Sequence, residues 1–180
     1  MHTENFNYLI ACPETGEALA IDPLDYGKCL SKAKDKGWEI TQILNTHEHG
    51  DHTGGNHAVI EATGAKLIAH ENAQGKIEGI DQGLKSGDVV KVGKSAELLA
   101  LDTPGHTMSP YMPTFKKQTL PLYSQAIHYL MLEPETVAEE DILKNFMKTF
   151  VSQLEKLADN TLIYPGHDYI TNNLGFYFRS

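Results

Sequence analysis

The sequence predicts a single-domain α/β protein. Short apolar runs typical of strands alternate with stretches of helical periodicity, and this alternation favours an α/β architecture. Apolar residues make up 41% and charged residues 22% of the 180 residues, which allows a packed core and argues against disorder. Three of the expected strands run directly into loops that contain glycine and histidine, so we expect the functional residues at these strand ends.

The expected elements follow from apolar periodicity and turn residues. Strands are expected over residues 8–10, 18–21, 40–44, 66–69, 89–92, 97–101 and 161–164, and helices over residues 26–36 and 56–63. The turn at residues 13–16 predicts a hairpin, and Gly37 and Gly64 stand where the two helices would end. The apolar face of the second helix is expected to hold Ala58, Val59 and Ala62.

The second half of the chain predicts one more amphipathic helix. Thr136 and Glu139 form a capping box at its start. Apolar residues that are expected to face the core then recur at helical spacing, namely Ile142, Leu143, Phe146, Met147, Phe150, Val151, Leu154 and Leu157. Before this helix, prolines at positions 110, 113 and 121 make residues 110–134 a poor central strand.

Charge and cysteine content narrow the function classes. The chain has 15 basic and 24 acidic residues, a net charge of −9, which argues against nucleic acid or an anionic membrane as the partner. No apolar run approaches the roughly 18 residues of a membrane span, and the N-terminus has no secretory signal. Cys12 and Cys29 form no metal-type or redox-type pair, so we expect two buried thiols and a cytoplasmic location.

One six-residue segment, HEHGDH, carries four side chains of the metal-ligand type. His47 and His49 are two residues apart, so in extended chain they point the same way and can reach one metal. Asp51 and His52 follow where Gly54 and Gly55 permit a sharp turn into a helix, and they can reach a second position. Imidazole and carboxylate ligands suit zinc, iron or manganese, and an open position on such a metal lowers the pKa of bound water to about 7.

Two further histidines stand in similar positions. His106 in TPGHT follows an expected strand, and His167 in PGHDY follows the last one. Both are therefore predicted to be metal ligands. His57 lies one turn into a helix, where a solvated or supporting role is expected. The remaining histidines, which have no ligand context and are expected to be structural or exposed, are His2, His70 and His128.

The segments THEHGDHTGGN, TPGHT and YPGHDY resemble the metallo-β-lactamase fold superfamily, and most closely its glyoxalase II branch. This resemblance implies a four-layer αββα sandwich with a two-metal site on one edge. It implies a first metal held by His47, His49 and His106 and a second held by Asp51, His52 and His167. Zinc is the expected metal, with iron or manganese as alternatives.

The resemblance also implies an activity. Enzymes of this branch hydrolyse a thioester such as S-lactoylglutathione by attack of metal-bound hydroxide, and the metals stabilise the oxyanion. Asp51 is the candidate catalytic residue, because it can accept a proton during this attack. The expected partner is therefore a small thioester, in a glutathione-derived form.

The sequence departs from the family pattern at residues 110–148 and 176–180. The family places a metal-bridging aspartate in a motif resembling SGDTLF between His106 and His167, and no such motif stands there. Reading suitable codons for residues 120–136 two bases later permits this motif, so we interpret the departure as a frameshift. The chain also lacks the C-terminal helices that bind glutathione in the branch. For the chain as written we therefore expect a sandwich that is incomplete in its second half, and one tightly bound metal.

Three alternatives stay open. A persulfide dioxygenase with a single iron has a similar set of motifs. An inactive, metal-binding remnant would account for the missing aspartate. A β-lactamase is less favoured, since Glu48 and His167 stand in glyoxalase-like contexts.

Overall fold

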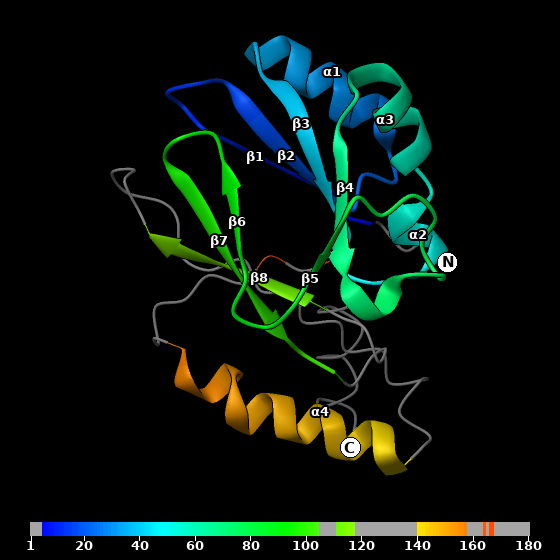
Figure 1. Cartoon of the computed structure of the whole chain (residues 1–180), viewed down its shortest axis with the longest axis vertical. Helices are drawn as coiled ribbons and strands as arrows, with labels where there is room; N and C mark the ends of the chain where they lie inside the picture. The colour runs from blue at the N-terminus through cyan, green and yellow to red at the C-terminus, as the bar shows by residue number, and fades with distance from the viewer. Residues whose placement is uncertain (1–4, 105–110, 118–139, 158–163, 165, 168–180) are drawn as a thin grey trace, which may run out of the picture.

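A computed structural model describes residues 5–104, 111–117, 140–157, 164 and 166–167 of the chain. Two β-sheets lie against each other, with α1 (Tyr26–Lys36) and α3 (Asn56–Thr63) on the outer side of the first sheet. The helix α4 (Glu140–Ser152) lies on the opposite side of the molecule, beyond the second sheet (Figure 1). This order of helix, sheet, sheet and helix confirms the predicted four-layer sandwich.

The first sheet has five strands in the order of the chain. They are β1 (Tyr8–Ala11), β2 (Glu17–Ile21), β3 (Glu39–Leu44), β4 (Lys66–His70) and β5 (Gln82–Leu84). The strands β1 and β2 form the predicted antiparallel hairpin, whereas β2, β3, β4 and β5 pair in parallel. Parallel neighbours need a crossover, which α1 and α3 supply. The carboxyl ends of β2, β3 and β4 therefore meet at one edge of the sheet.

The second sheet is antiparallel in the part of the chain that the structure describes. It contains β6 (Val89–Val92), β7 (Ala96–Asp102) and β8 (Tyr111–Lys117), in that order. The strand β8 lies at the edge, and its Pro113 pairs in register with Ala100. An edge is where a strand tolerates proline, because one side of the ladder is left open. No strand was predicted at residues 111–117, so β8 corrects that expectation, although among the described strands it lies at the edge of its sheet rather than at the centre.

The helices of the first half begin and end as predicted. Asp25 caps α1 by accepting a hydrogen bond from the Lys28 backbone N–H. Gly37 and Gly64 adopt the left-handed conformation, with φ of 68° and 70°, directly after α1 and α3. A short helix, α2 (Gly50–Thr53), was not predicted. The 3₁₀ turns η1 (Glu71–Ala73) and η3 (Leu154–Lys156) complete the described elements.

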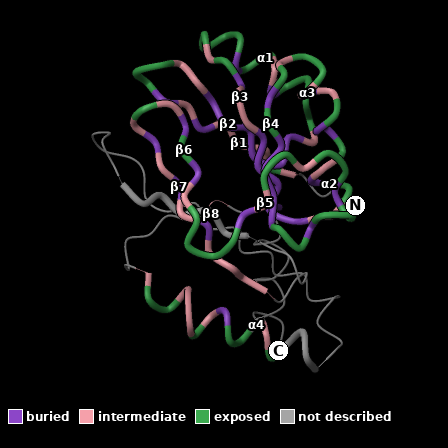
Figure 2. The backbone as a smooth tube through the Cα atoms, in the orientation of Figure 1, coloured by how far each residue is buried: buried purple, intermediate pink, exposed green. Residues whose placement is uncertain are grey.

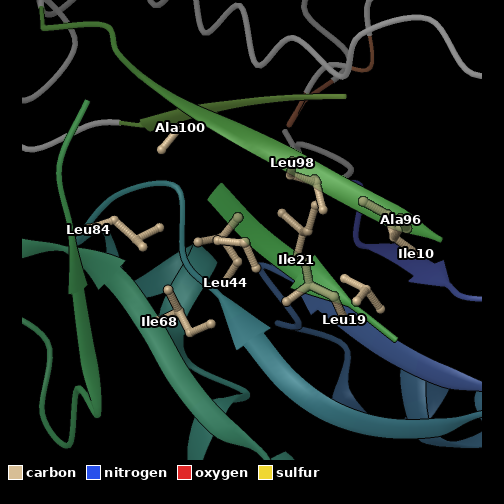
Figure 3. Close-up of a cluster of buried hydrophobic side chains, with 11 residues drawn as sticks. Ile10, Leu19, Ile21, Leu44, Ile68, Leu84, Ala96, Leu98 and Ala100 are labelled. Atoms are coloured by element: carbon tan, nitrogen blue, oxygen red, sulfur yellow. The ribbon is translucent and has the colours of Figure 1, made fainter. Parts of the chain in front are cut away.

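Both faces of the first sheet are covered, so consecutive residues of β2 and β4 are buried without alternation. Leu19, Ile21 and Leu44 point toward the second sheet, where they pack with Leu98 (Figure 3). Side chains on the opposite face pack under the helices in a second cluster that includes Ala18, Ala20, Ile40, Ile43, Val59 and Leu67. Figure 2 shows this buried interior along the first sheet. Cys12 and Cys29 are buried and free, as expected.

Two details of the predicted core are wrong. Ala62 on α3 is exposed, because α3 presents mainly Val59 to the sheet. On α4, Met147 and Val151 are 54% and 56% exposed, so this part of its apolar stripe does not face the core. Thr149 is buried, and its hydroxyl donates to the Pro104 carbonyl oxygen at 2.9 Å. The predicted capping box of α4 and the predicted last strand, except Tyr164, lie outside the described residues.

Candidate metal centre

The site forms where two parallel strands, β2 and β3, end at the same edge of the first sheet. Asp22 directly follows β2, and Asn45, Thr46 and His47 directly follow β3. The short helix α2 then brings Asp51 and His52 back toward this edge. All of these side chains except Asp51 are buried, so the sheet edge holds a buried polar cluster.

Asp22 is the centre of the polar network. Its carboxylate accepts hydrogen bonds from the Thr46 backbone N–H at 2.8 Å, the Thr46 hydroxyl at 2.6 Å and His52 Nδ1 at 2.9 Å. Asp22 is fully buried and has a φ of 46°, a left-handed conformation that costs free energy outside glycine. A buried carboxylate is stable only when it is hydrogen-bonded, and these three donors satisfy that need.

These hydrogen bonds fix the tautomers of two histidines. The Asp22 carboxylate can only accept, so His52 donates from Nδ1, and its neutral ring leaves a lone pair on Nε2. The Thr46 hydroxyl donates to Asp22 and can therefore only accept from His47 Nδ1, which lies 3.0 Å away. Neutral His47 then also carries its lone pair on Nε2. The Asp22 carboxylate thus sets the tautomers of His47 and His52, directly or through Thr46, so that Nε2 of each ring can bind a metal.

Three of the predicted site residues, Asp51, His52 and His167, converge. Their ligand atoms all lie within 4.8 Å of one another, although they are up to 116 residues apart in sequence. His52 Nε2 lies 3.0 Å from His167 Nε2, and Asp51 Oδ2 lies 3.5 Å from the same His167 atom. A lone-pair nitrogen, a second imidazole nitrogen and a carboxylate oxygen facing one point form the donor set that a divalent transition metal prefers.

The start of the chain positions His167. The Phe6 backbone N–H donates to the Gly166 carbonyl oxygen at 2.8 Å, and Asn5 forms a β-bridge with His167. Tyr8 on β1 packs edge-on against Tyr164, with ring centroids 5.8 Å apart. Burial, with a smaller contribution from Tyr164, raises the pKa of Tyr8 to about 12, so the Tyr8 ring stays neutral in this contact. Segments from the two ends of the chain are therefore joined beside the site.

Asp51 is the accessible member of the site, with 49% of its side chain exposed. Partial burial acts to raise its pKa, but attraction to His52 and His167 and a hydrogen bond from the Asn5 amide outweigh this effect. The pKa of Asp51 therefore lies below its usual value, and the carboxylate is ionised at neutral pH.

The other two histidines of the HEHGDH segment lie beside this cluster. The His47 ring centroid is 4.1 Å from that of His52 and 4.6 Å from that of His49. His47 and His49 thus lie together, as their spacing predicts. His106 lies outside the described residues, so the first predicted metal position is seen only in part. His57 is 94% exposed in its side chain, in agreement with a solvated role.

Gly55 is required because a side chain would not fit at this position, and not because its backbone conformation excludes other residues. Its φ is −93° and that of Gly54 is −60°, so neither uses the conformational freedom that was predicted. A Cβ atom at Gly55 would instead lie 1.8 Å from the Pro23 carbonyl oxygen. The loop after β3 therefore packs directly on the backbone that follows Asp22.

Comparison with known proteins decides the family. The sequence pattern of the metallo-beta-lactamase superfamily matches residues 9–120. The chain belongs to this superfamily. Two hydroxyacylglutathione hydrolases, from Polaromonas sp. and Nitrosococcus oceani, are 58% and 55% identical over 172 residues, which is 96% of this chain. The chain spans 65% of the length of each of these relatives.

Solved structures show the same superfamily fold. ETHE1 from Myxococcus xanthus has a TM-score of 0.76 at 24% identity and covers 94% of this chain and 77% of its own. The B3 metallo-beta-lactamase BLEG-1 has a TM-score of 0.75 at 17% identity, with 93% and 88% covered. Membership of the superfamily implies a divalent metal, and the donor set of Asp51, His52 and His167 fits such an ion.

Sequence reasoning missed the residues that support the ligands. From the sequence, Asp22 marks only the end of a strand, and Thr46 has no predicted role. The available signal was position, because Asp22 and Thr46 follow neighbouring parallel strands whose carboxyl ends meet at one edge.

Proposed function

We propose that the chain is a metal-dependent hydrolase of glutathione thioesters such as S-lactoylglutathione. The observation that carries this proposal is the 58% identity, over 96% of the chain, to a hydroxyacylglutathione hydrolase. The convergence of Asp51, His52 and His167 supports it, because it supplies the expected ligand type at the expected sheet edge. The proposed substrate is a small molecule, with neither nucleic acid nor membrane as a partner, and the proposed location is the cytoplasm.

The proposed ligands fall into two sets. One ion is held by His47, His49 and His106, and a second by Asp51, His52 and His167, with zinc as the favoured metal and iron or manganese as alternatives. When bound, such a metal supplies Lewis acidity and lowers the pKa of water to about 7. Asp22 keeps the Nε2 lone pairs of His47 and His52 available, directly and through Thr46.

Asp51 is proposed to move the proton. Its lowered pKa keeps the carboxylate ionised, and its exposure lets water approach. It can therefore accept a proton from the water that attacks the thioester carbonyl. The products of this hydrolysis are a carboxylic acid and a free thiol.

We propose that the second ion is the weaker one. Between His106 and residue 149 the sequence offers no aspartate in the family's bridging motif, so less negative charge offsets two dications. Metal titration with elemental analysis should find one tightly held ion per chain. Two tightly held ions would contradict this proposal. Sequencing of the encoding DNA tests the frameshift hypothesis, which requires a codon set that gives the aspartate motif in another frame.

The experiment for the activity is an assay of S-lactoylglutathione hydrolysis on metal-loaded protein, followed by the loss of thioester absorbance. His52→Ala should abolish turnover and reduce metal content. His57→Ala is the matched control, because this exposed histidine on α3 lies outside the cluster and should leave both unchanged. Metal-bound protein without turnover would support the inactive remnant instead. Iron with oxygen uptake on glutathione persulfide would support the dioxygenase.

A further inference from the structure

A second polar feature lies at the carboxyl ends of β4 and β7. It is a pocket of about 250 Å³, and its lining includes His70, Glu71, Asn72, Lys85, Ser86 and Asp102. Pockets that enclose a whole small ligand measure roughly 300–1,000 Å³. This pocket is therefore of a size to take one polar head group of a larger ligand.

The pocket is adjacent to the candidate metal centre. The strands β3 and β4 are parallel neighbours, and the Asn45 backbone N–H donates to the Ile68 carbonyl oxygen at 3.0 Å. Two residues further along each strand stand His47, in the metal centre, and His70, in the pocket. The pocket and the metal centre therefore lie beyond the carboxyl ends of two neighbouring strands, at the same edge of the sheet.

His70 lies beside the Asp102 carboxylate in this pocket. The Asn72 backbone N–H donates to His70 Nδ1 at 2.9 Å, so the proton of the neutral ring is on Nε2. His70 Nε2 lies 3.4 Å from Asp102 Oδ1. His70 is 8% exposed in its side chain and Asp102 is 44% exposed, so a buried ring lies beside a carboxylate that is partly open to solvent.

The charges of the pocket favour a zwitterion. Lys85 Nζ lies 3.4 Å from Glu71 Oε2, and the Ser86 hydroxyl accepts from the Asp102 backbone N–H. The lining holds the two carboxylates of Glu71 and Asp102 and the one ammonium group of Lys85, a balance that attracts an ammonium group and disfavours a simple anion. Lys85 and Ser86 still offer donors to a carboxylate attached to the same ligand.

We propose that this pocket binds the α-amino-acid end of the γ-glutamyl group of glutathione. The α-ammonium group pairs with Asp102 and Glu71, and the α-carboxylate with Lys85 and Ser86. This inference rests on the proposed function, because it assumes that the thiol half of the substrate is glutathione.

The test compares S-lactoylglutathione with its N-acetyl derivative, which lacks the ammonium charge. In the wild-type protein, acetylation should lower kcat/KM about tenfold, mainly through KM, since a charge-assisted hydrogen bond is lost. Asp102→Asn should lower kcat/KM for the free amine by a similar factor and should make acetylation nearly without effect. Asp35→Asn, an exposed aspartate on α1, is the control and should behave as the wild-type protein. Equal turnover of both substrates by the wild-type protein would overturn the proposal.

A binding experiment separates this inference from the proposed activity. Titration calorimetry with S-methylglutathione and its N-acetyl form needs no turnover. If the acetylated form binds the wild-type protein more weakly than the free amine, and Asp102→Asn does not distinguish the two, the pocket is supported. This holds even if no thioester is hydrolysed, and in that case only the proposed activity is wrong. Equal binding of the two forms, or no binding of either, contradicts the pocket whatever the activity.

Discussion

The loops after β3 and β4 leave neighbouring strands at one edge of the sheet, but they are built in opposite ways. In the loop after β3, residues 45–56, the polar side chains of Asn45, Thr46, His52 and Asn56 are buried and hydrogen-bonded. In the loop after β4, residues 71–81, most side chains are exposed, and Ala73 and Ile77 are the buried anchors.

The difference lies in which groups hold each loop. The loop after β3 is fixed by the buried carboxylate of Asp22, whereas the loop after β4 relies on surface ion pairs such as that of Lys76 with Glu48 at 2.6 Å. Buried charged hydrogen bonds are costly to break, and exposed ion pairs contribute little. The carboxyl end of β3 can thus hold metal-ligand side chains in fixed positions, whereas the carboxyl end of β4 carries exposed polar side chains that can adjust.

Removal of Asp22 should give the largest effect. Asp22→Ala leaves His52 Nδ1–H and both Thr46 donors buried without their acceptor, so the free energy of unfolding should fall by about 3–5 kcal/mol. Metal affinity should fall about 10- to 100-fold, because the tautomers of His47 and His52 are no longer fixed. Urea unfolding and metal titration measure the two effects, with Asp35→Ala as the exposed control. Unchanged metal affinity in a folded Asp22→Ala protein would refute the tautomer argument.

Crowding at Gly55 should have the next largest effect. Gly55→Ala places a Cβ atom against the Pro23 carbonyl oxygen, and displacement of that backbone should cost about 3 kcal/mol in the free energy of unfolding. Gly50→Ala is the matched control, since no heavy atom lies within 4 Å of a Cβ there. Urea denaturation of both variants checks this. If the two variants were equally stable, the close approach of the two loops would be contradicted.

Loss of the Lys76 ion pair should have the smallest effect. Lys76→Met removes a partner of Glu48 at a site where Lys76 is 46% exposed, so we expect a loss of about 0.5 kcal/mol or less in the free energy of unfolding. Metal content should be unchanged. Lys32→Met, an exposed position on α1, provides the reference in the same unfolding measurement. A large loss of metal from Lys76→Met alone would show that the loop after β4 is as critical as the loop after β3.

Sequence patterns predicted the elements of the first half well because local physics determines them. Asp25, Gly37 and Gly64 act within a few residues of the helix ends that they cap. The three side chains that converge, Asp51, His52 and His167, had been predicted as ligands, since closely spaced histidines between a strand and glycines are typical of a metal site. Asp22 was not, because its role depends on a residue 30 positions away. Exposure of Met147 and Val151 was missed for a similar reason, as periodicity indicates an apolar stripe but not what covers it.

The link between Phe6 and Gly166 has a consequence for biosynthesis. Asp22, Thr46 and His52 leave the ribosome early, whereas His167 follows 115 residues after His52 and needs the first strand as its support. Contacts of such long sequence separation form late and slowly. A nascent chain can therefore assemble half of the cluster before His167 is synthesised, but the complete cluster forms only when residues 166–167 meet Asn5 and Phe6. Cofactor loading is thereby delayed until synthesis of this region has finished.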